Sequence, residues 1–238
     1  MSQEEIIEKE GMVILLDRLG SKGIWKDGDT THVISDWLLL MAVFKSYLED
    51  IQKKFPYKFF TFSDTVVITM YGSESEELFN DMCSTIIPMF AAAMAQKIFF
   101  RGGFNFGKYY DPEQMLLGPA VDELSQYYTL PEWIGISAAP SAHRVLDKME
   151  KNKNIISGFV KYDVPLKNSI EKNGWAINWP NFTDQKLKDL GTHLKTRTPF
   201  NNTIELIDEQ LKGTIDIQTS FKWRNTENFV LAMKKKVI

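Results

Sequence analysis

The sequence predicts an α+β fold in which helices back an antiparallel sheet on the split βαβ, or ferredoxin-like, plan. The 238 residues are enough for one sizeable core. Apolar periodicity gives the order strand, helix, hairpin, helix, strand along the first half of the chain. The rest is less regular. We therefore expect residues 1–238 to form a single domain, with a core over about 10–145 and a C-terminal α/β extension over about 146–238.

The first half of the predicted core is a strand, a helix and a hairpin. Residues 12–17 (MVILLD) form a short apolar run that ends in a charge, which is typical of a buried strand. After a loop of Gly, Ser and Lys, residues 31–54 carry apolar side chains at close to helical spacing. Aromatic and β-branched residues over 57–71 then flank Ser63 and Asp64, which predicts two strands joined by a polar turn.

A second long helix and a glycine-containing strand complete the predicted core. Residues 74–97 carry a Met-rich apolar stripe, which indicates core packing. A strand over 98–107 follows, then a helix that opens at Gly118-Pro119, where Pro suits the first turn, and a strand over 131–138. For the extension we expect strands and helices over the ranges 156–164, 175–180, 183–190, 201–212 and 224–235.

Composition argues against several classes of function. The net charge of −3, without a basic stripe, gives no reason to expect a nucleic-acid partner. The start is acidic and no apolar run approaches the roughly 20 residues of a membrane span, so we expect a cytoplasmic protein without membrane contact. The single cysteine, Cys83, excludes an internal disulfide and fits the core. The three histidines are far apart, which argues against a zinc site.

Two aspartates are the strongest candidates for a functional site. Asp17 closes the first strand and Asp64 lies at the tip of the hairpin. In the split βαβ plan the first strand and the first hairpin strand are typically neighbours, so the two carboxylates would meet at one end of the sheet. Such charges repel unless a cation neutralises them, and Mg²⁺ or Mn²⁺ together with substrate phosphates would do so. A purely structural role, in which each Asp closes its own turn, remains the alternative.

Four motifs occur in order along the chain: LLDRLG, TFSDTVVI, FRGGFNFG and GPAVDELSQ. Together they resemble the catalytic core of class III nucleotidyl cyclases over roughly residues 10–145. That family shows a strand ending in a metal-binding Asp, a Gly/Ser-Asp hairpin, an Arg- and Gly-containing strand, and a Gly-x-x-Val-Asn helix. The details resemble most the bacterial pyrimidine cyclases of the Pycsar antiphage system, which are compact stand-alone domains with a C-terminal extension.

The resemblance implies a site with two divalent ions. Asp17 and Asp64 would bind Mn²⁺ or Mg²⁺, with the backbone carbonyl of Arg18 as a further ligand. The ions would clamp the triphosphate and lower the pKa of the ribose 3′-hydroxyl, which attacks the α-phosphorus and expels pyrophosphate. Arg101 matches the strand arginine that contacts the outer phosphates. An ion pair on the rim of the sheet is the alternative for Arg101.

The resemblance also suggests where the triphosphate and the base bind. The loop RLGSKG offers the N–H groups of Leu19, Gly20 and Ser21 to the triphosphate. Phe60, four residues before Asp64, takes the position at which purine cyclases carry a Lys or Glu that reads the base edge. A Phe can stack on a ring but cannot make that hydrogen bond, which favours a pyrimidine substrate. We expect UTP before CTP; core packing is the alternative role of Phe60.

The sequence departs from the family on the helix after residue 118. The wider family usually supplies an Asn there and an Arg four residues later, whereas this chain has Asp122 and Gln126. Loss of a transition-state arginine is costly in phosphoryl transfer, so either another cation substitutes, or the rate is modest, or the site is inactive. Lys22, Lys108 and Arg144 are the candidates. Because both metal-binding aspartates are kept, we expect an active enzyme.

The family builds its site between two cyclase domains, and this chain has one, so the resemblance implies a homodimer with sites at the interface. The leading expectation is an enzyme that makes a 3′,5′-cyclic pyrimidine nucleotide as an antiphage signal, read by a separate effector. An ATP-using class III cyclase or another palm-type transferase is one alternative. A catalytically inactive cyclase fold that binds a nucleotide or a partner is the other.

Overall fold

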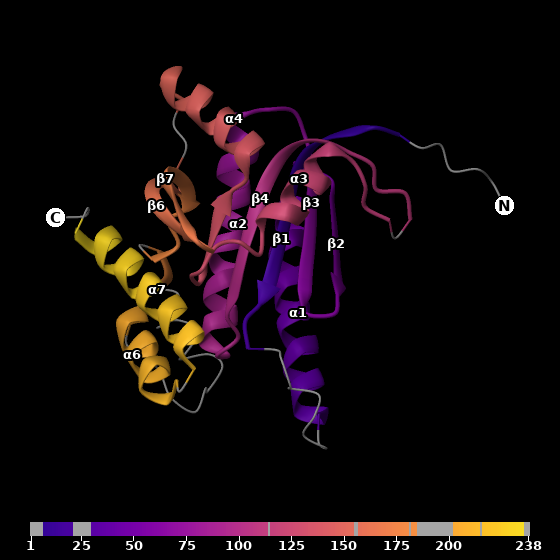
Figure 1. Ribbon diagram of the computed structural model, residues 1–238. Coiled ribbons are helices and arrows are strands. Elements are labelled where there is room, and N and C mark those ends of the chain that lie inside the picture. Colours follow the sequence, from indigo (N-terminus) through magenta and orange to yellow (C-terminus); the bar gives the residue numbers. More distant parts are fainter. Residues whose placement is uncertain are drawn as a thin grey trace.

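The structure is a computed structural model that describes residues 7–20, 30–113, 115–154, 157–180, 182–184, 202–214 and 216–235 (Figure 1). Seven strands form one sheet in the order β2-β3-β1-β4-β5-β7-β6. Their bounds are β1 Lys9–Arg18, β2 Tyr57–Phe62, β3 Thr65–Tyr71, β4 Phe100–Tyr109, β5 Gly135–Ala138, β6 Phe159–Leu166 and β7 Ser169–Ile177. The α+β fold predicted from the sequence is confirmed. The sheet is mixed, however, because β4 and β5 pair in parallel while the other neighbours are antiparallel.

The pairing of β1 differs from the prediction. Its hairpin neighbour is the second strand, β3, and the first strand, β2, lies at the edge of the sheet. Burial explains the difference: β3 has five consecutive buried residues and belongs in the sheet interior, whereas β2 has only half-buried and exposed ones. The predicted meeting of Asp17 with the hairpin tip still follows, because Asp17 lies opposite Thr65, the residue after Asp64.

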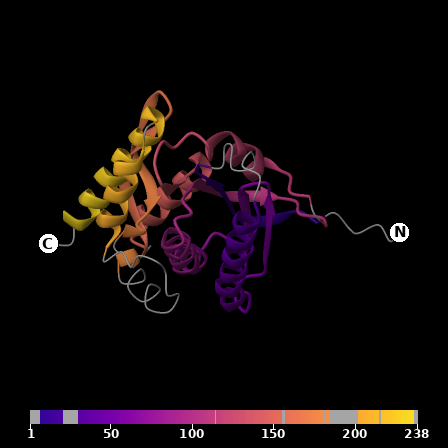
Figure 2. The same ribbon diagram turned by 90° about the horizontal axis from the view of Figure 1, so that it is seen from below.

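Helices cover both faces of the sheet (Figure 2). Helices α1 (Thr31–Ile51) and α2 (Glu76–Ala95) pack against each other and against one face, and α3 (Pro119–Tyr127) packs on β1 and β4 from the other. Successive residues of β1 alternate between these cores, with Ile14 on the α1/α2 side and Val13 and Leu15 on the α3 side. By the same alternation, Asp17 belongs to the α3 face.

Helix α2 contributes more buried residues to the core on the α1/α2 side than any other described element. The Ser75 side chain caps it by accepting a hydrogen bond from Leu78 N at 3.2 Å. Cys83 is 2% exposed, as predicted for a core thiol. Among the described helices, α2 is the one long and apolar enough to cross a membrane, and 72% of its apolar window is buried inside the molecule. Such burial is what a core helix shows, so this is a weak indication of a membrane span.

The C-terminal extension continues the sheet and adds helices beside it (Figure 1). The described helices that follow β5 are α4 (Pro140–Lys151), α6 (Thr203–Gly213) and α7 (Ile217–Lys235). Phe229 of α7 packs edge-on against Trp133, with 4.5 Å between ring centroids, and Trp133 stacks on Tyr162 of β6 at 5.5 Å. The extension therefore packs through aromatic side chains onto the β5 side of the sheet.

The extension also differs from its predicted elements. Helix α4 was not predicted, β7 begins earlier than the expected strand over 175–180, and α7 begins seven residues before the expected residue 224. Most of the predicted helix over 183–190 lies outside the described residues. Five of the twelve residues of the missed helix are charged, and Pro140 at its start is the local signal that favours it.

Candidate active site

The two candidate aspartates lie at the same end of the sheet. Arg18 N donates to the carbonyl oxygen of Asp64 at 3.1 Å, and Leu19 N donates to the carbonyl oxygen of Phe99 at 2.8 Å. The end of β1 is thus held on one side by the hairpin tip and on the other by the start of β4. Ser63, in the turn, has a φ of 56°, a left-handed conformation that suits a tight hairpin. The backbone therefore fixes Asp17 and Asp64 close together.

Arg101 lies beside Asp17 on the opposite neighbouring strand. The two residues are register partners of β4 and β1, and Arg101 Nε donates to Asp17 Oδ2 at 3.0 Å. The guanidinium also donates from Nη1 to Glu132 Oε1 at 3.3 Å. The three side chains are only 12–22% exposed, so these ion pairs are screened less by solvent than surface pairs are. Both sequence-based roles of Arg101, ion pairing and phosphate binding, stay compatible with this position.

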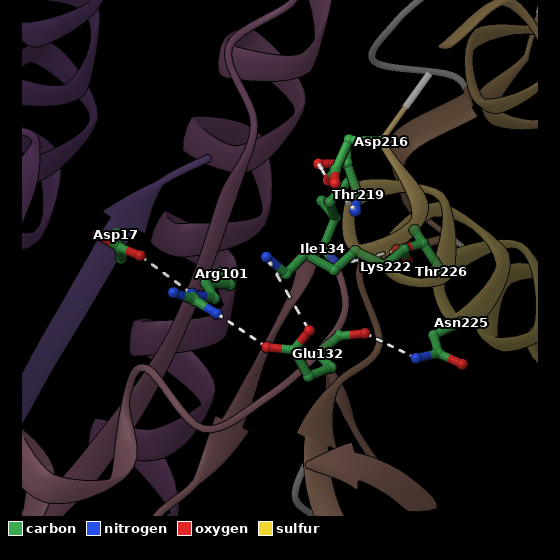
Figure 3. Close-up of polar contacts among 9 residues, drawn as sticks. All are labelled: Asp17, Arg101, Glu132, Ile134, Asp216, Thr219, Lys222, Asn225 and Thr226. Carbon is green, nitrogen blue, oxygen red and sulfur yellow. Dashed lines mark hydrogen bonds and ion pairs between the residues drawn. The ribbon is translucent and has the colours of Figure 1, made fainter. Parts of the chain in front are cut away.

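Two further charged residues complete the cluster, and sequence reasoning missed both (Figure 3). Glu132 lies just before β5, and Lys222 of α7 extends toward it, with 4.0 Å between Lys222 Nζ and Glu132 Oε2. Burial lowers the pKa of Lys222, an effect that the carboxylate of Glu132 opposes. No local pattern marks these residues, because their contact joins positions 90 residues apart. The cluster thus draws on the core and on the extension.

Arg18 directs its side chain away from this cluster, toward α1. Its guanidinium carbon lies 5.4 Å from the centroid of the Trp37 ring. Burial lowers the pKa of Arg18, and the charges of Asp36 and Asp64 oppose that shift. The predicted use of Arg18 was its backbone carbonyl, which this side-chain position does not obstruct.

The predicted triphosphate loop is described in part. Leu19 packs against the α1/α2 core, and its N–H is engaged by Phe99 in this conformation. Gly20 has a φ of 79°, with open space around the position of a Cβ atom. Ser21 lies outside the described residues. Of these two loop residues, Gly20 has open space in which a phosphate group could lie, whereas the Leu19 N–H already donates a hydrogen bond.

Phe60 lies on the same face of the sheet as Asp17. Across the strands it is level with Leu15, two residues before Asp17. It pairs with Val67, which pairs in turn with Leu15, and all three contribute to the α3-side core. Phe60 is half-buried there. Phe62, in the row of Asp17, is 78% exposed. The edge strand β2 therefore places the aromatic side chains of Phe60 and Phe62 on the sheet face that carries Asp17.

The two positions of α3 at which the family usually carries an Asn and an Arg have no positively charged side chain in this protein. Asp122 and Gln126 are both exposed on α3, and Gln126 Nε2 donates to the Asp122 carbonyl at 3.3 Å. Lys108 pairs with Glu8 near the other end of β4, and Arg144 donates to a serine of its own helix α4. The third predicted substitute, Lys22, lies outside the described residues. Within the described chain, neither Lys108 nor Arg144 contacts the Asp17 cluster.

The donor set suits a hard divalent ion that shares its ligands with a substrate. The described residues contain no group of three or more His, Cys, Asp and Glu side chains that could hold a metal ion. Mg²⁺ is commonly held by one or two carboxylates and completed by substrate phosphates, which is what Asp17 and Asp64 could provide. The Asp17 carboxylate is paired with the Arg101 guanidinium, so a divalent ion that binds Asp17 would have to displace that group.

Comparisons with protein-family models and with curated proteins found no match for this chain. Solved structures do match. The catalytic core of a rhodopsin-guanylyl cyclase with converted specificity, in complex with ATPαS, is 13% identical with a TM-score of 0.53. The non-canonical dimeric guanylyl cyclase domain of the RhoGC fusion protein from the aquatic fungus Blastocladiella emersonii is 13% identical with a TM-score of 0.52. Each match covers 72% of this chain and 98% of the other.

These likenesses establish the fold. The chain has the fold of the catalytic domains of class III nucleotidyl cyclases, as its motifs predicted. At 13% identity the comparison does not transfer a substrate or an activity. The function therefore has to be argued from the residues of the site.

Proposed function

We propose that the protein is a metal-dependent nucleotidyl cyclase that converts a pyrimidine nucleoside triphosphate, UTP before CTP, to the 3′,5′-cyclic monophosphate and pyrophosphate. The observation that carries this proposal is the adjacency of Asp17, Asp64 and Arg101 at one end of a cyclase-fold sheet. Two acidic residues and a cation are the minimum set for binding metal ions and a triphosphate together.

In this mechanism Asp17, Asp64 and the carbonyl of Arg18 would hold two Mg²⁺ or Mn²⁺ ions. Bound there, the ions lower the pKa of the ribose 3′-hydroxyl and neutralise phosphate charge. The 3′-hydroxyl gives its proton to solvent water and its oxygen attacks the α-phosphorus, the bond from that phosphorus to the bridging oxygen breaks, and pyrophosphate leaves with the electron pair. Arg101 binds the outer phosphates and stabilises the charge that develops on the leaving group. Gly20 and Ser21 would cradle the triphosphate, whereas the predicted contribution of Leu19 would require its N–H to leave the Phe99 carbonyl.

Phe60 supports the pyrimidine part of the proposal. Its half-buried ring lies on the face of Asp17, where it can stack on a base, and it offers no hydrogen bond to a purine edge. The preference for UTP over CTP rests on the family resemblance. The proposed biological role, a cytoplasmic antiphage signal passed to a separate effector, rests on the same resemblance.

The proposed enzyme is a homodimer with its sites at the interface. One of the similar structures is a non-canonical dimeric guanylyl cyclase domain, so the interfacial site is supported by the family resemblance. In this chain, Phe62 is 78% exposed on the face of the aspartates, where a second copy would cover it. We propose no nucleic-acid or membrane partner.

The second candidate function is a nucleotide-binding protein without catalysis. It is favoured by Asp122 and Gln126, which replace the family's Asn and Arg and are exposed without a cation nearby on α3. An ATP-using cyclase is a further alternative, since Asp17 and Asp64 could bind the metal ions for a purine nucleotide as well as for a pyrimidine nucleotide.

The test is to incubate the purified protein with each of the four nucleoside triphosphates and Mn²⁺ or Mg²⁺, and to identify products by mass. We expect cyclic UMP or cyclic CMP from the wild type and none from Asp17→Asn or Asp64→Asn. Asp163→Asn, which breaks an exposed pair with Lys172, is the matched control and should keep activity. Cyclic AMP would retain the cyclase and refute the pyrimidine assignment. Metal-dependent nucleotide binding without product would favour the binding protein.

A further inference from the structure

Lys222 is the charged residue through which the C-terminal helix reaches the candidate site. We propose that the ammonium of Lys222 is a second phosphate-binding cation in the reaction and that Glu132 is a positioning residue for both Lys222 and Arg101. This inference rests on the proposed function. It adds α7 to a site otherwise built from β1, the hairpin and β4.

The geometry places Lys222 on the side of Arg101 that faces the extension (Figure 3). Glu132 lies between the two cations, with one carboxylate oxygen 3.3 Å from Arg101 Nη1 and the other 4.0 Å from Lys222 Nζ. The side chain of Lys222 is 19% exposed. A triphosphate that is bound next to Asp17 and Arg101 would therefore lie within the field of the Lys222 ammonium.

The contact between Lys222 and Glu132 leaves the ammonium available. Strong ammonium–carboxylate hydrogen bonds are about 2.7–2.9 Å long, and this pair is at 4.0 Å. Burial lowers the pKa of Lys222, Glu132 opposes the shift, and the nearby positive charges of Arg101 and Lys167 lower that pKa further. Asp17 acts in the opposite direction, and the two partly buried cations Arg101 and Lys222 share the carboxylate of Glu132, an arrangement that an anionic ligand beside them would stabilise.

The anchoring of α7 does not depend on Lys222. Asn225 Nδ2 donates to the Glu132 carbonyl at 2.8 Å, and Ile134 N donates to Thr226 Oγ1 at 2.8 Å. Phe229 adds its contact with the ring of Trp133. With the helix already held by these contacts, a charged and partly buried lysine needs a different reason to be there, and phosphate binding provides one.

Lys222 also addresses the cation that the chain lacks on α3. Position 126 is Gln, and phosphoryl transfer depends strongly on cations that stabilise charge on the outer phosphates. Lys222 would supply this charge from the same chain that holds Asp17. Because Glu132 pairs with Arg101 through one carboxylate oxygen and faces Lys222 with the other, it would hold both cations near the triphosphate.

The test measures binding without turnover. Inorganic triphosphate and Mg²⁺ are titrated by calorimetry into the wild type, Lys222→Gln and Lys222→Arg. We expect Lys222→Gln to weaken triphosphate binding about tenfold, or about 1.4 kcal/mol, and Lys222→Arg to stay within about threefold of the wild type. Lys234→Gln is the matched control, because Lys234 lies on the same helix and pairs with Asp184 instead. It should bind triphosphate as the wild type does.

Glu132→Gln tests positioning in the same assays. Removing a negative charge should keep or tighten triphosphate binding, while misplacement of the two cations should lower kcat about tenfold or more. Unchanged binding in Lys222→Gln, with cyclic product still formed at the wild-type rate, would overturn the role of Lys222 and leave the proposed function intact. A wild type that forms cyclic product but binds no inorganic triphosphate would overturn the phosphate-binding role of Lys222 alone, and a wild type that forms no cyclic product from any nucleoside triphosphate would count against the proposed function.

Discussion

Arg101 Nε donates to Asp17 Oδ2 across 3.0 Å, so the guanidinium occupies the carboxylate that the proposed metal site needs. The two side chains are 12% and 18% exposed, which makes their attraction stronger than that of a surface pair. A divalent ion that binds Asp17 must therefore compete with Arg101. Release of Arg101 from Asp17 would direct it to the phosphates, so metal binding and phosphate binding are coupled.

Replacing Arg101 should have opposite effects on metal binding and on catalysis. Without nucleotide, Arg101→Gln is expected to bind Mn²⁺ several-fold more tightly, because the competing cation is gone. Its cyclase activity should fall by about 10²-fold or more, because one phosphate-stabilising charge is lost. Mn²⁺ titration followed by electron paramagnetic resonance, alongside product assays, measures both. Arg144→Gln, on α4, serves as the control, and equal Mn²⁺ affinity in Arg101→Gln would refute the competition.

Gly102 is predicted to tolerate no side chain. A Cβ atom there would lie 2.2 Å from the backbone oxygen of Leu15, in the middle of the β1–β4 pairing that aligns Asp17 with Arg101. Gly102→Ala should lower the free energy of unfolding by about 2 kcal/mol or more, because the strands must separate. Gly213→Ala, at the end of α6 with no atom within 4 Å, should be neutral or slightly stabilising. Urea unfolding compares the two, and equal midpoints would contradict the clash.

Phe60 and Phe59 allow a test of base stacking within one strand. Phe60 contributes to the α3-side core on the face of Asp17, whereas Phe59 packs against the α1/α2 core. Both are half-buried, so each alanine variant should cost roughly 1–2 kcal/mol of stability, less than a fully buried Phe. Phe60→Ala should also raise KM for UTP and CTP by about tenfold through lost stacking. If Phe59→Ala raises KM equally, the effect is structural rather than one of base contact.

Asp184 should make the extension sensitive to acid. Its carboxylate accepts hydrogen bonds from the backbone and hydroxyl of Thr203 at 3.0 and 2.6 Å and pairs with Lys234 at 2.8 Å. Burial acts to raise the pKa of Asp184, but Lys234 and Thr203 outweigh it, so that pKa is lowered. Because this pKa is lower in the folded than in the unfolded protein, the ionised Asp184 carboxylate stabilises the fold fully at pH values above the unfolded-state pKa. The stabilisation is lost as the pH falls through the folded-state pKa.

Asp184→Asn is therefore expected to be less stable than the wild type by about 1–2 kcal/mol near neutral pH. This difference should shrink toward zero as pH falls below the ordinary Asp value of 3.8. Urea unfolding at a series of pH values measures it, with Asp208→Asn, at an exposed position of α6, as the control. A difference that is independent of pH would show that the carboxylate charge is not what stabilises this contact.

The core of this fold was predictable because its signals are local. The apolar run that ends at Asp17 and the aromatic strands around Ser63-Asp64 each report their structure within a few residues. The pairing of β1 with β3 required a comparison of the two hairpin strands, and β3 is the more apolar. Helix α4 was missed because its charged residues obscure its apolar face.

The candidate site was only partly predictable. Asp17, Asp64 and Arg101 lie within motifs, whereas Glu132 and Lys222 become neighbours through tertiary packing. The contact between them depends on how α7 docks against the segment before β5, and aromatic stacking around Trp133 decides that docking. Charge patterns along the chain do not encode such a contact.

The ion pairs of the site join residues in a particular chain order. Arg101 meets Asp17 across 84 positions and Glu132 across 31, while Lys222 comes near the end of the sequence. During protein synthesis the aspartates and Arg101 emerge from the ribosome well before α7, so the full set of charges cannot assemble on a nascent chain that has not reached Lys222. Translation of the final helix is thus the step at which this cluster is completed.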